Sequence, residues 1–254
     1  MKWIDVCIFI MLLFIPEPLW SVNSYPEWFL YPYKYPNITT GYSYNGLSAK
    51  EDVVSMLTAY SDCVVNGHLE VFEYPGRDDV LKNSEYYYWF SEQSADNLRS
   101  RIIPLQRYDI DLLTKDYIQA FSMDSIKLDS VPLVDIQTLK RPWWIEKFCF
   151  ESDQYYYGVG MYTSQGREND AWKTAEEQAV FSILTHVAVR FHNIVILKKT
   201  SSPQEGFTKI SFLELRFHLE NIHILERYPD WKNQLYYVLV RIHKSNIHSP
   251  LLKQ

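Results

Sequence analysis

The two halves of the chain carry the same short motifs in the same order. Pro26-Glu27-Trp28 is echoed by Pro142-Trp143-Trp144, and Leu105-Gln106-Arg107-Tyr108 is echoed by Leu225-Glu226-Arg227-Tyr228. Internal repetition constrains a fold more than any single motif does, because each copy is expected to form the same structural unit. The chain has 254 residues, 47% of them hydrophobic. That is enough material for two units of about 100 residues each.

Each copy contains one expected helix after a glycine-containing segment. In the first copy, Ser48 and Glu51 form a capping box, and Asn66-Gly67 is expected to end the helix. In the second copy, a narrow stripe of small and aliphatic residues favours close packing of the helix on a sheet. The stripe comprises Ala171, Ala175, Ala179, Ile183 and Val187. The charged residues on the other side, interpreted as solvent-exposed, are Lys173, Glu176 and Glu177.

Two pairs of strand-like segments close the two copies, and each pair is expected to form a hairpin. The pairs are residues 102–108 with 117–123 in the first copy and 222–228 with 235–242 in the second. Aligning Arg107 with Arg227 and Tyr117 with Tyr237 requires one shared offset along the chain, which is hard to obtain by chance. Residues 212–220 alternate between apolar and polar side chains, which predicts a further, half-buried strand.

These patterns predict an α+β fold of two tandem small modules, each a helix packed on a mostly antiparallel sheet. The segment between the repeats contains Pro132 and few aromatic residues, so it is interpreted as a linker. The expected organisation is a signal peptide over residues 1–24, a diverged first module over 25–123, a linker over 124–140, a second module over 141–246 and a flexible tail over 247–254.

The amino terminus is typical of an exported protein. Lys2 precedes an apolar run over residues 6–15 that is too short to span about 30 Å of hydrocarbon. An uncleaved anchor or a buried helix are the alternatives. Cys7 does not lie in a lipobox, so we expect no lipid anchor there. Cys63 and Cys149 remain after cleavage, either as one disulfide or as two separate thiols.

The second copy resembles the bacterial Lpp-twenty lipoprotein family, which is also similar to part of flagellar assembly protein T. The resemblance rests on the Pro-Trp opening, on Gly158-Val159-Gly160, on the alanine stripe and on the closing run from Tyr236 to Ile242. It implies a small domain with a helix packed on a mostly antiparallel sheet, in an exported envelope protein. The family offers no catalytic residues to carry over.

Known catalytic and metal-binding patterns are missing from the sequence. Gly158-Val159-Gly160 lacks the third glycine of a dinucleotide fingerprint and the lysine of a P-loop, so we interpret it as a tight strand end. His218 and His223 are five positions apart and fall on opposite faces of a regular strand. We therefore expect no enzyme, no cofactor and no metal. The net charge of −6 argues against a nucleic-acid partner.

The abundance of aromatic residues is the main indication of function. Exposed rings can anchor a protein interface or stack on sugars, although core packing also uses them. The candidate binding residues are Trp28, Tyr31, Tyr33, Trp89, Trp143 and Trp144. We predict a non-catalytic protein of the periplasm or outer membrane that binds another envelope or surface protein. The alternatives are a cell-wall glycan-binding module and a small hydrolase with a site between the modules.

Overall fold

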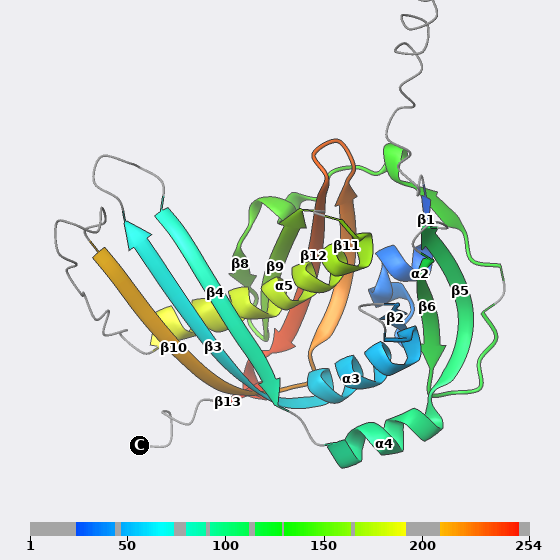
Figure 1. Ribbon diagram of the computed structural model, residues 1–254, viewed down its shortest axis with the longest axis horizontal. Coiled ribbons are helices and arrows are strands. Elements are labelled where there is room, and N and C mark those ends of the chain that lie inside the picture. The colour runs from blue at the N-terminus through cyan, green and yellow to red at the C-terminus, as the bar shows by residue number, and fades with distance from the viewer. Residues whose placement is uncertain are drawn as a thin grey trace, which may run out of the picture.

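The computed structural model describes residues 24–43, 47–73, 80–89, 92–111, 115–128, 130–163, 166–191 and 209–248 (Figure 1). The predicted signal peptide lies outside them except for Ser24. The helices and strands of the first half are β1 (Ser24–Pro26), α2 (Glu27–Leu30), η1 (Pro32–Lys34), β2 (Thr39–Tyr42), α3 (Ala49–Ser61), β3 (Asp62–Glu73), β4 (Val80–Trp89), α4 (Glu92–Arg101), β5 (Ile103–Asp111) and β6 (Asp116–Ser122).

The second half begins with four short elements and the strand β9, and continues with one long helix and the remaining strands. Its elements are β7 (Leu133–Asp135), η2 (Ile136–Thr138), η3 (Trp143–Glu146), β8 (Cys149–Glu151), β9 (Tyr155–Thr163), α5 (Glu168–Phe191), β10 (Lys209–Glu220), β11 (His223–Asp230), β12 (Leu235–His243), η5 (Lys244–Asn246) and β13 (Ile247–His248). All strand pairs in the described residues are antiparallel, which confirms the predicted α+β class.

Both predicted hairpins are present, and they lie in sheets with corresponding strand order. The first-half sheet is ordered β2-β6-β5, and the second-half sheet is ordered β11-β12-β9-β8. In each, the strand before the helix pairs with the last strand of the hairpin. Gly41 and Arg107 both face Gln119 across neighbouring strands, as Gly160 and Arg227 both face Val238. We call such a row of directly paired residues across neighbouring strands a rung. The two sheets thus contain corresponding rungs, each with a glycine on the strand before the helix and an arginine on the first strand of the hairpin.

The register of the two hairpins differs by one residue from the predicted alignment. Arg107 pairs with Gln119 and Arg227 pairs with Val238, so a single offset does not hold across both strands of the hairpins. Both β5 and β11 have an irregularity just before the arginine, and β5 has a second one near its end. Such irregularities insert a residue that sequence alignment alone does not detect.

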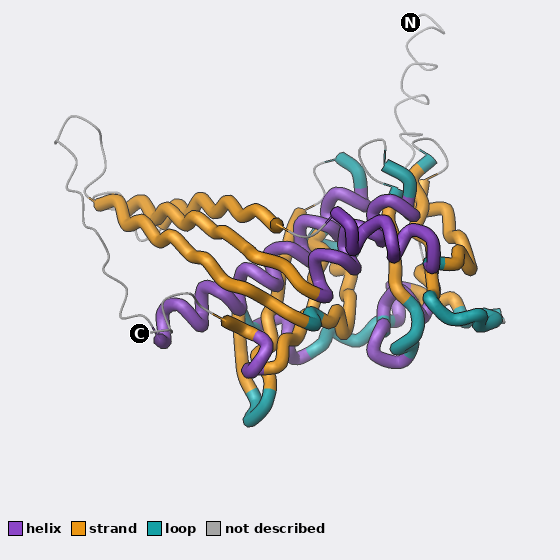
Figure 2. Tube along the Cα trace, turned by 90° about the horizontal axis from the view of Figure 1, so that it is seen from below, coloured by secondary structure: helices purple, strands orange, loops and turns teal. Residues whose placement is uncertain are grey.

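A third sheet joins the two halves of the chain. In it β3 lies between β4 and β10, and β10 pairs with β3 from Lys209–Glu73 to Glu220–Asp62. Figure 2 shows these long strands running side by side. Most buried apolar residues of both halves belong to one continuous cluster. The division into two tandem modules stays a prediction, and the halves share a core.

Several local predictions are wrong. Helix α3 ends at Ser61, and Asn66-Gly67 lies within β3 because the chain enters a long strand paired on both sides. Gly158 and Gly160 lie inside β9 rather than at its end. The expected linker contains β7, which pairs with β1. The expected flexible tail begins with β13, which pairs with β10.

Candidate functional site

Two of the six predicted binding residues are buried and cannot contact a partner. Trp28 is 1% exposed and Trp144 is 2% exposed. Each indole N–H donates to a hairpin side chain, Trp28 to Gln106 at 3.0 Å and Trp144 to Glu226 at 2.7 Å. The Pro-Trp motifs therefore attach the start of each half to its own hairpin, which is a structural role. Indoles are often buried in this way, because the N–H then has a partner.

The other four predicted residues lie at the surface in different places. Tyr31 is half-buried and Tyr33 is exposed beside it, with ring centroids 6.2 Å apart at η1. Trp89 lies at the end of β4 and is 64% exposed, and Trp143 lies in η3 and is 66% exposed. The structure therefore does not gather the predicted residues into one site. They lie on three separate surfaces, around Tyr31 and Tyr33, around Trp143 and around Trp89, of which the last two are described next.

Trp143 belongs to an aromatic row on the sheet formed by β8, β9, β11 and β12. Its ring centroid lies 5.0 Å from that of Phe150, which stacks on Tyr157 at 4.8 Å with the rings almost parallel. Phe150 pairs directly with Tyr157 across β8 and β9. Phe148, which immediately precedes β8, is also exposed. Phe148 and Phe150 were not among the predicted binding residues, because the significance of an aromatic residue in or beside a short strand depends on its neighbours across the sheet.

The row lies on the face of the sheet that α5 does not cover, here called the outer face. Alternation along β9 and β12 places Gly158, Gly160 and Val238 toward α5. The outer-face residues of these strands and of β8 are Phe150, Tyr155, Tyr157, Val159, Met161, Thr163, Leu235, Tyr237, Leu239, Arg241 and His243. Among the described residues, Trp144 and Ile145 of η3 and Leu225 and Tyr228 of β11 join several of them in a small second apolar cluster. The outer face is thus rich in apolar and aromatic side chains, and some of them are exposed.

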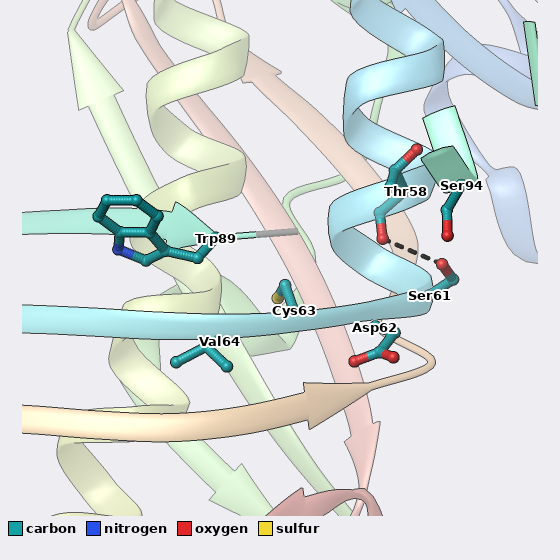
Figure 3. Close-up of a pocket in the computed structure, with 7 residues that line it drawn as sticks. All are labelled: Thr58, Ser61, Asp62, Cys63, Val64, Trp89 and Ser94. Atoms are coloured by element: carbon teal, nitrogen blue, oxygen red, sulfur yellow. Dashed lines mark hydrogen bonds between the residues drawn. The ribbon is translucent and has the colours of Figure 1, made fainter. Parts of the chain in front are cut away.

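The second surface lies on the sheet that joins the halves. One rung runs across all four of its strands, from Trp89 through Val64 and His218 to His248. A cavity of about 300 Å³ opens beside Trp89 and Asp62 (Figure 3), where Ser61 donates a hydrogen bond to the carbonyl of Thr58. The cavity is lined by Thr58, Ser61, Asp62, Cys63, Val64, Trp89 and Ser94.

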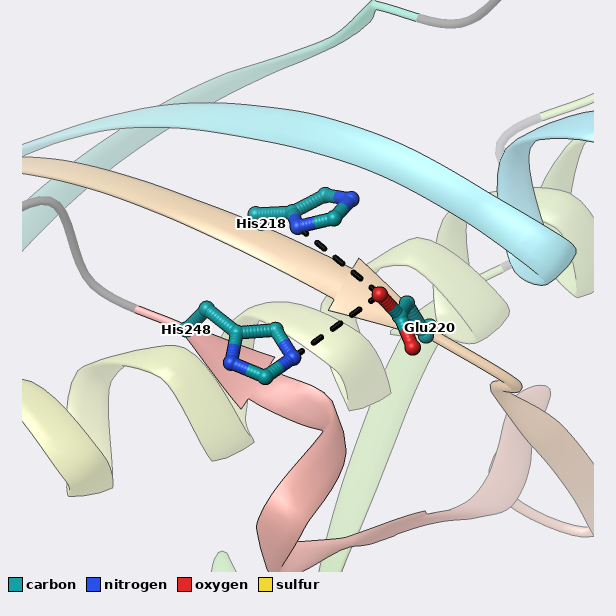
Figure 4. A group of neighbouring side chains, drawn as sticks. All are labelled: His218, Glu220 and His248. Carbon is teal, nitrogen blue, oxygen red and sulfur yellow. Dashed lines mark ion pairs between the residues drawn. The ribbon is translucent and has the colours of Figure 1, made fainter.

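Next to this cavity, three potential metal ligands lie together (Figure 4). The ligand atoms of His218, Glu220 and His248 lie within 4.8 Å of one another. His218 Nε2 also lies 2.5 Å from Asp62 Oδ1. Sequence analysis paired His218 with His223 and expected no metal. It could not find His248, because that residue lies 30 positions away and meets His218 only through the pairing of β13 with β10.

A buried ionic network connects α5 with the first half of the chain and with β11. Arg227 contacts Glu176, which also accepts a hydrogen bond from the hydroxyl of Tyr42 at 2.5 Å. Burial, opposed in part by Arg227, raises the pKa of Tyr42 well above its usual value. Lys173 pairs with buried Asp52 at 2.9 Å. The prediction that Lys173 and Glu176 are solvent-exposed is therefore wrong, because partners from other elements cover that side of α5.

Cys63 and Cys149, the cysteines among the described residues, are free thiols, so neither is part of a disulfide in this structure. Among the described residues, no helix has the length and apolar character needed to cross a membrane. The chain matches no protein-family model, no curated protein and no solved structure. Its function is therefore argued from its own geometry.

Proposed function

We propose that the chain is a non-catalytic, exported protein of the bacterial cell envelope that binds another envelope or surface protein through the outer face. The observation that carries this proposal is the row of Trp143, Phe150 and Tyr157 on the sheet face opposite α5, where η3 covers part of the face and leaves Trp143 exposed. The export signal and the resemblance to the Lpp-twenty family support the compartment. The buried residues Trp28 and Trp144 are not part of the proposed interface.

The physical basis of the proposal is the cost of leaving aromatic surface in water. Exposed rings of Trp143 and Phe148 gain free energy when a partner covers them, at about 25 cal/mol per Å² of apolar surface. The ring of Trp143 is already ordered against that of Phe150, so little conformational entropy is lost there on binding. Arg241 lies over the ring of Tyr155, 4.9 Å from its centroid, and supplies charge at the margin of the row. An apolar centre with a polar rim is the usual arrangement of protein interfaces.

Two tandem modules are part of the same proposal. The corresponding strand orders support it, as do the glycine–arginine rungs and the two Trp-to-hairpin hydrogen bonds. In the second half, η3 packs on Val159, Tyr237 and Leu239 of the outer face, whereas Met161 on the same face is exposed. In the first half the corresponding face is packed, because Tyr42 and Ile118 on it are fully buried. The interface is therefore assigned to the second module.

Site-specific photo-crosslinking in cells tests the proposed interface. A photoreactive phenylalanine analogue at Phe148 or Trp143 is expected to give a discrete crosslinked band with an envelope protein. The same analogue at Trp89 is the matched control, because Trp89 is equally exposed but lies on a different sheet. Equal crosslinking from Trp89 and Trp143, or none from the outer face, would contradict the proposal.

Two further outcomes decide between the proposal and its alternatives. Binding of the purified chain to peptidoglycan that is lost in Trp143→Ala, without any protein crosslink, would favour the glycan-binding module. Hydrolysis of an ester, amide or glycosidic substrate that depends on Asp62 or His218 would favour the hydrolase, since these two residues come from different halves of the chain. Amino-terminal sequencing of the chain from cell fractions tests export, with cleavage near Ser24 expected.

A further inference from the structure

We propose that His218, Glu220 and His248 bind one divalent transition-metal ion of the Zn²⁺ class. The site is independent of the proposed interface, because it lies on a different sheet. Imidazole and carboxylate together are the ligand set that Zn²⁺ and its neighbours in the series prefer, whereas Mg²⁺ and Ca²⁺ prefer oxygen ligands alone.

The backbone places the three ligands without strain in the strands. His218 and Glu220 are two positions apart on β10 and therefore point to the same face. His248 lies directly opposite His218 on β13. Cross-strand neighbours of this kind have side chains that meet above the sheet. The ligands therefore converge from two paired strands, and Figure 4 shows both imidazole rings directed at Glu220.

The distances between the ligand atoms fit a single ion. Glu220 Oε1 lies 4.0 Å from His218 Nδ1 and 3.8 Å from His248 Nε2. Ligands at about 2.0–2.1 Å from a tetrahedral Zn²⁺ are roughly 3.4 Å apart. Small rotations of exposed or half-exposed side chains close this difference. The exposure of the site leaves the fourth coordination position to water.

Asp62 fixes the proton on the correct nitrogen of His218. A carboxylate only accepts hydrogen bonds, so the short contact between His218 Nε2 and Asp62 Oδ1 places the proton of the neutral ring on Nε2. Nδ1 then offers its lone pair toward Glu220 and the ion. A carboxylate that orients a metal-binding histidine in this way is common at zinc sites. When both histidines are neutral, the two negative charges of Asp62 and Glu220 balance the two positive charges of a divalent cation.

Binding is expected to hold β13 against β10. The two strands share only the register pairs His218–His248 and Leu219–Ile247, and such a short pairing adds little stability by itself. A metal that binds the folded chain alone adds stability by mass action. The ion would thus anchor the end of the described chain to the sheet that joins the two halves.

The test is a titration of the full chain, without a polyhistidine tag, with Zn²⁺ in the presence of a chromogenic competing chelator. One ion per chain is expected. His248→Ala should weaken binding at least tenfold, and Asp62→Asn should weaken it roughly 10–100-fold. His223→Ala is the matched control and should bind as the wild type does, because His223 is a nearby exposed histidine outside the site.

A second measurement needs no variant. Co²⁺ added to the wild-type chain should give the intense visible absorption of a tetrahedral site, and Zn²⁺ should remove it. The absence of one tight site, a His248→Ala variant that binds as the wild type does, or loss of binding in His223→Ala would each overturn the assignment. Circular dichroism of each variant shows that a loss of binding is not a loss of folding.

Discussion

Arg227 of β11 and Glu176 of α5 form an ion pair from which water is almost completely excluded. Their side chains are 1% and 0% exposed, and Arg227 Nη2 lies 2.7 Å from Glu176 Oε1. Arg227 also donates to the carbonyl of Phe29 at 2.7 Å, and its guanidinium lies over the ring of Phe29. The pair thus connects α5, the second hairpin and the short helix α2, which contains Phe29.

Removing one partner of this pair is expected to destabilise the fold strongly. Glu176→Ala leaves the guanidinium of Arg227 buried without its counter-ion, which costs about 3–5 kcal/mol of unfolding free energy. Urea denaturation followed by tryptophan fluorescence measures the loss. Arg107→Ala is the control: Arg107 occupies the corresponding rung, but its ion pair with Asp109 is exposed and is expected to contribute about 0–1 kcal/mol. Equal effects of the two substitutions would contradict the buried role of Glu176.

Local patterns predicted both hairpins and the two main helices, whereas the ends of elements and the contacts between distant segments were often missed. The motif containing Arg227 and its hairpin were found from repetition and alternation. Glu176 was assigned to solvent, because a charged residue beside an alanine stripe normally faces water. Its burial depends on Arg227 and Tyr42, which come from two other elements. Periodicity carries no information about such partners.

The same reasoning explains which parts of the candidate sites were predictable. Trp143 and Trp89 were found because an aromatic excess is visible in composition, although their exposure was not. Trp28 and Trp144 were expected at the surface, but each indole has a partner about 80 residues away in sequence. The pairing of β3 with β10 was also missed, because strand pairing between distant segments leaves no local signature.

Gly160 is expected to tolerate no side chain. A Cβ atom there would lie 1.9 Å from the carbonyl oxygen of Ala175 in α5, so Gly160→Ala must push the helix away from β9. We expect a loss of about 1–3 kcal/mol from such overpacking. Met161→Ala, at the neighbouring exposed position, should change stability by less than about 0.5 kcal/mol.

Gly41 provides an internal test of the same contact in the first half. Its Cβ would lie 2.0 Å from the carbonyl oxygen of Ala49 in α3. Gly41→Ala should therefore destabilise the chain by a similar amount to Gly160→Ala, measured by the same thermal or urea denaturation. If Gly41→Ala leaves the free energy of unfolding unchanged while Gly160→Ala lowers it, the helices of the two halves do not pack on their sheets in the same way.

The thiols of Cys63 and Cys149 are expected to be unreactive in the folded chain. Burial raises the pKa of each thiol to about 12, so almost no thiolate is present at pH 8. In a Cys7→Ser background, a disulfide-exchange reagent should label both residues slowly in buffer and rapidly in urea. Rapid labelling in buffer, or a mobility change on reduction that indicates a disulfide, would contradict this expectation.

Glu168, in the first turn of α5, is expected to make the stability of the chain depend on pH. Burial, opposed by a hydrogen bond from the indole of Trp172, raises the pKa of its carboxyl from 4.5 to about 8. Between these values the unfolded chain has lost the proton and the folded chain still holds it. Folding therefore takes up a proton in this window, and the free energy of unfolding decreases as pH rises.

The size of this effect is measurable against a single variant. The slope from Glu168 is at most about 1.4 kcal/mol per pH unit, present from about pH 5 to pH 8 and absent above that range. Glu168→Gln carries no titrating group at this position, so its urea stability should decrease less over the same interval and exceed that of the wild type at pH 8. If the two proteins show parallel stability profiles from pH 5 to pH 8, the carboxyl is ionised in the folded state and the raised pKa is wrong.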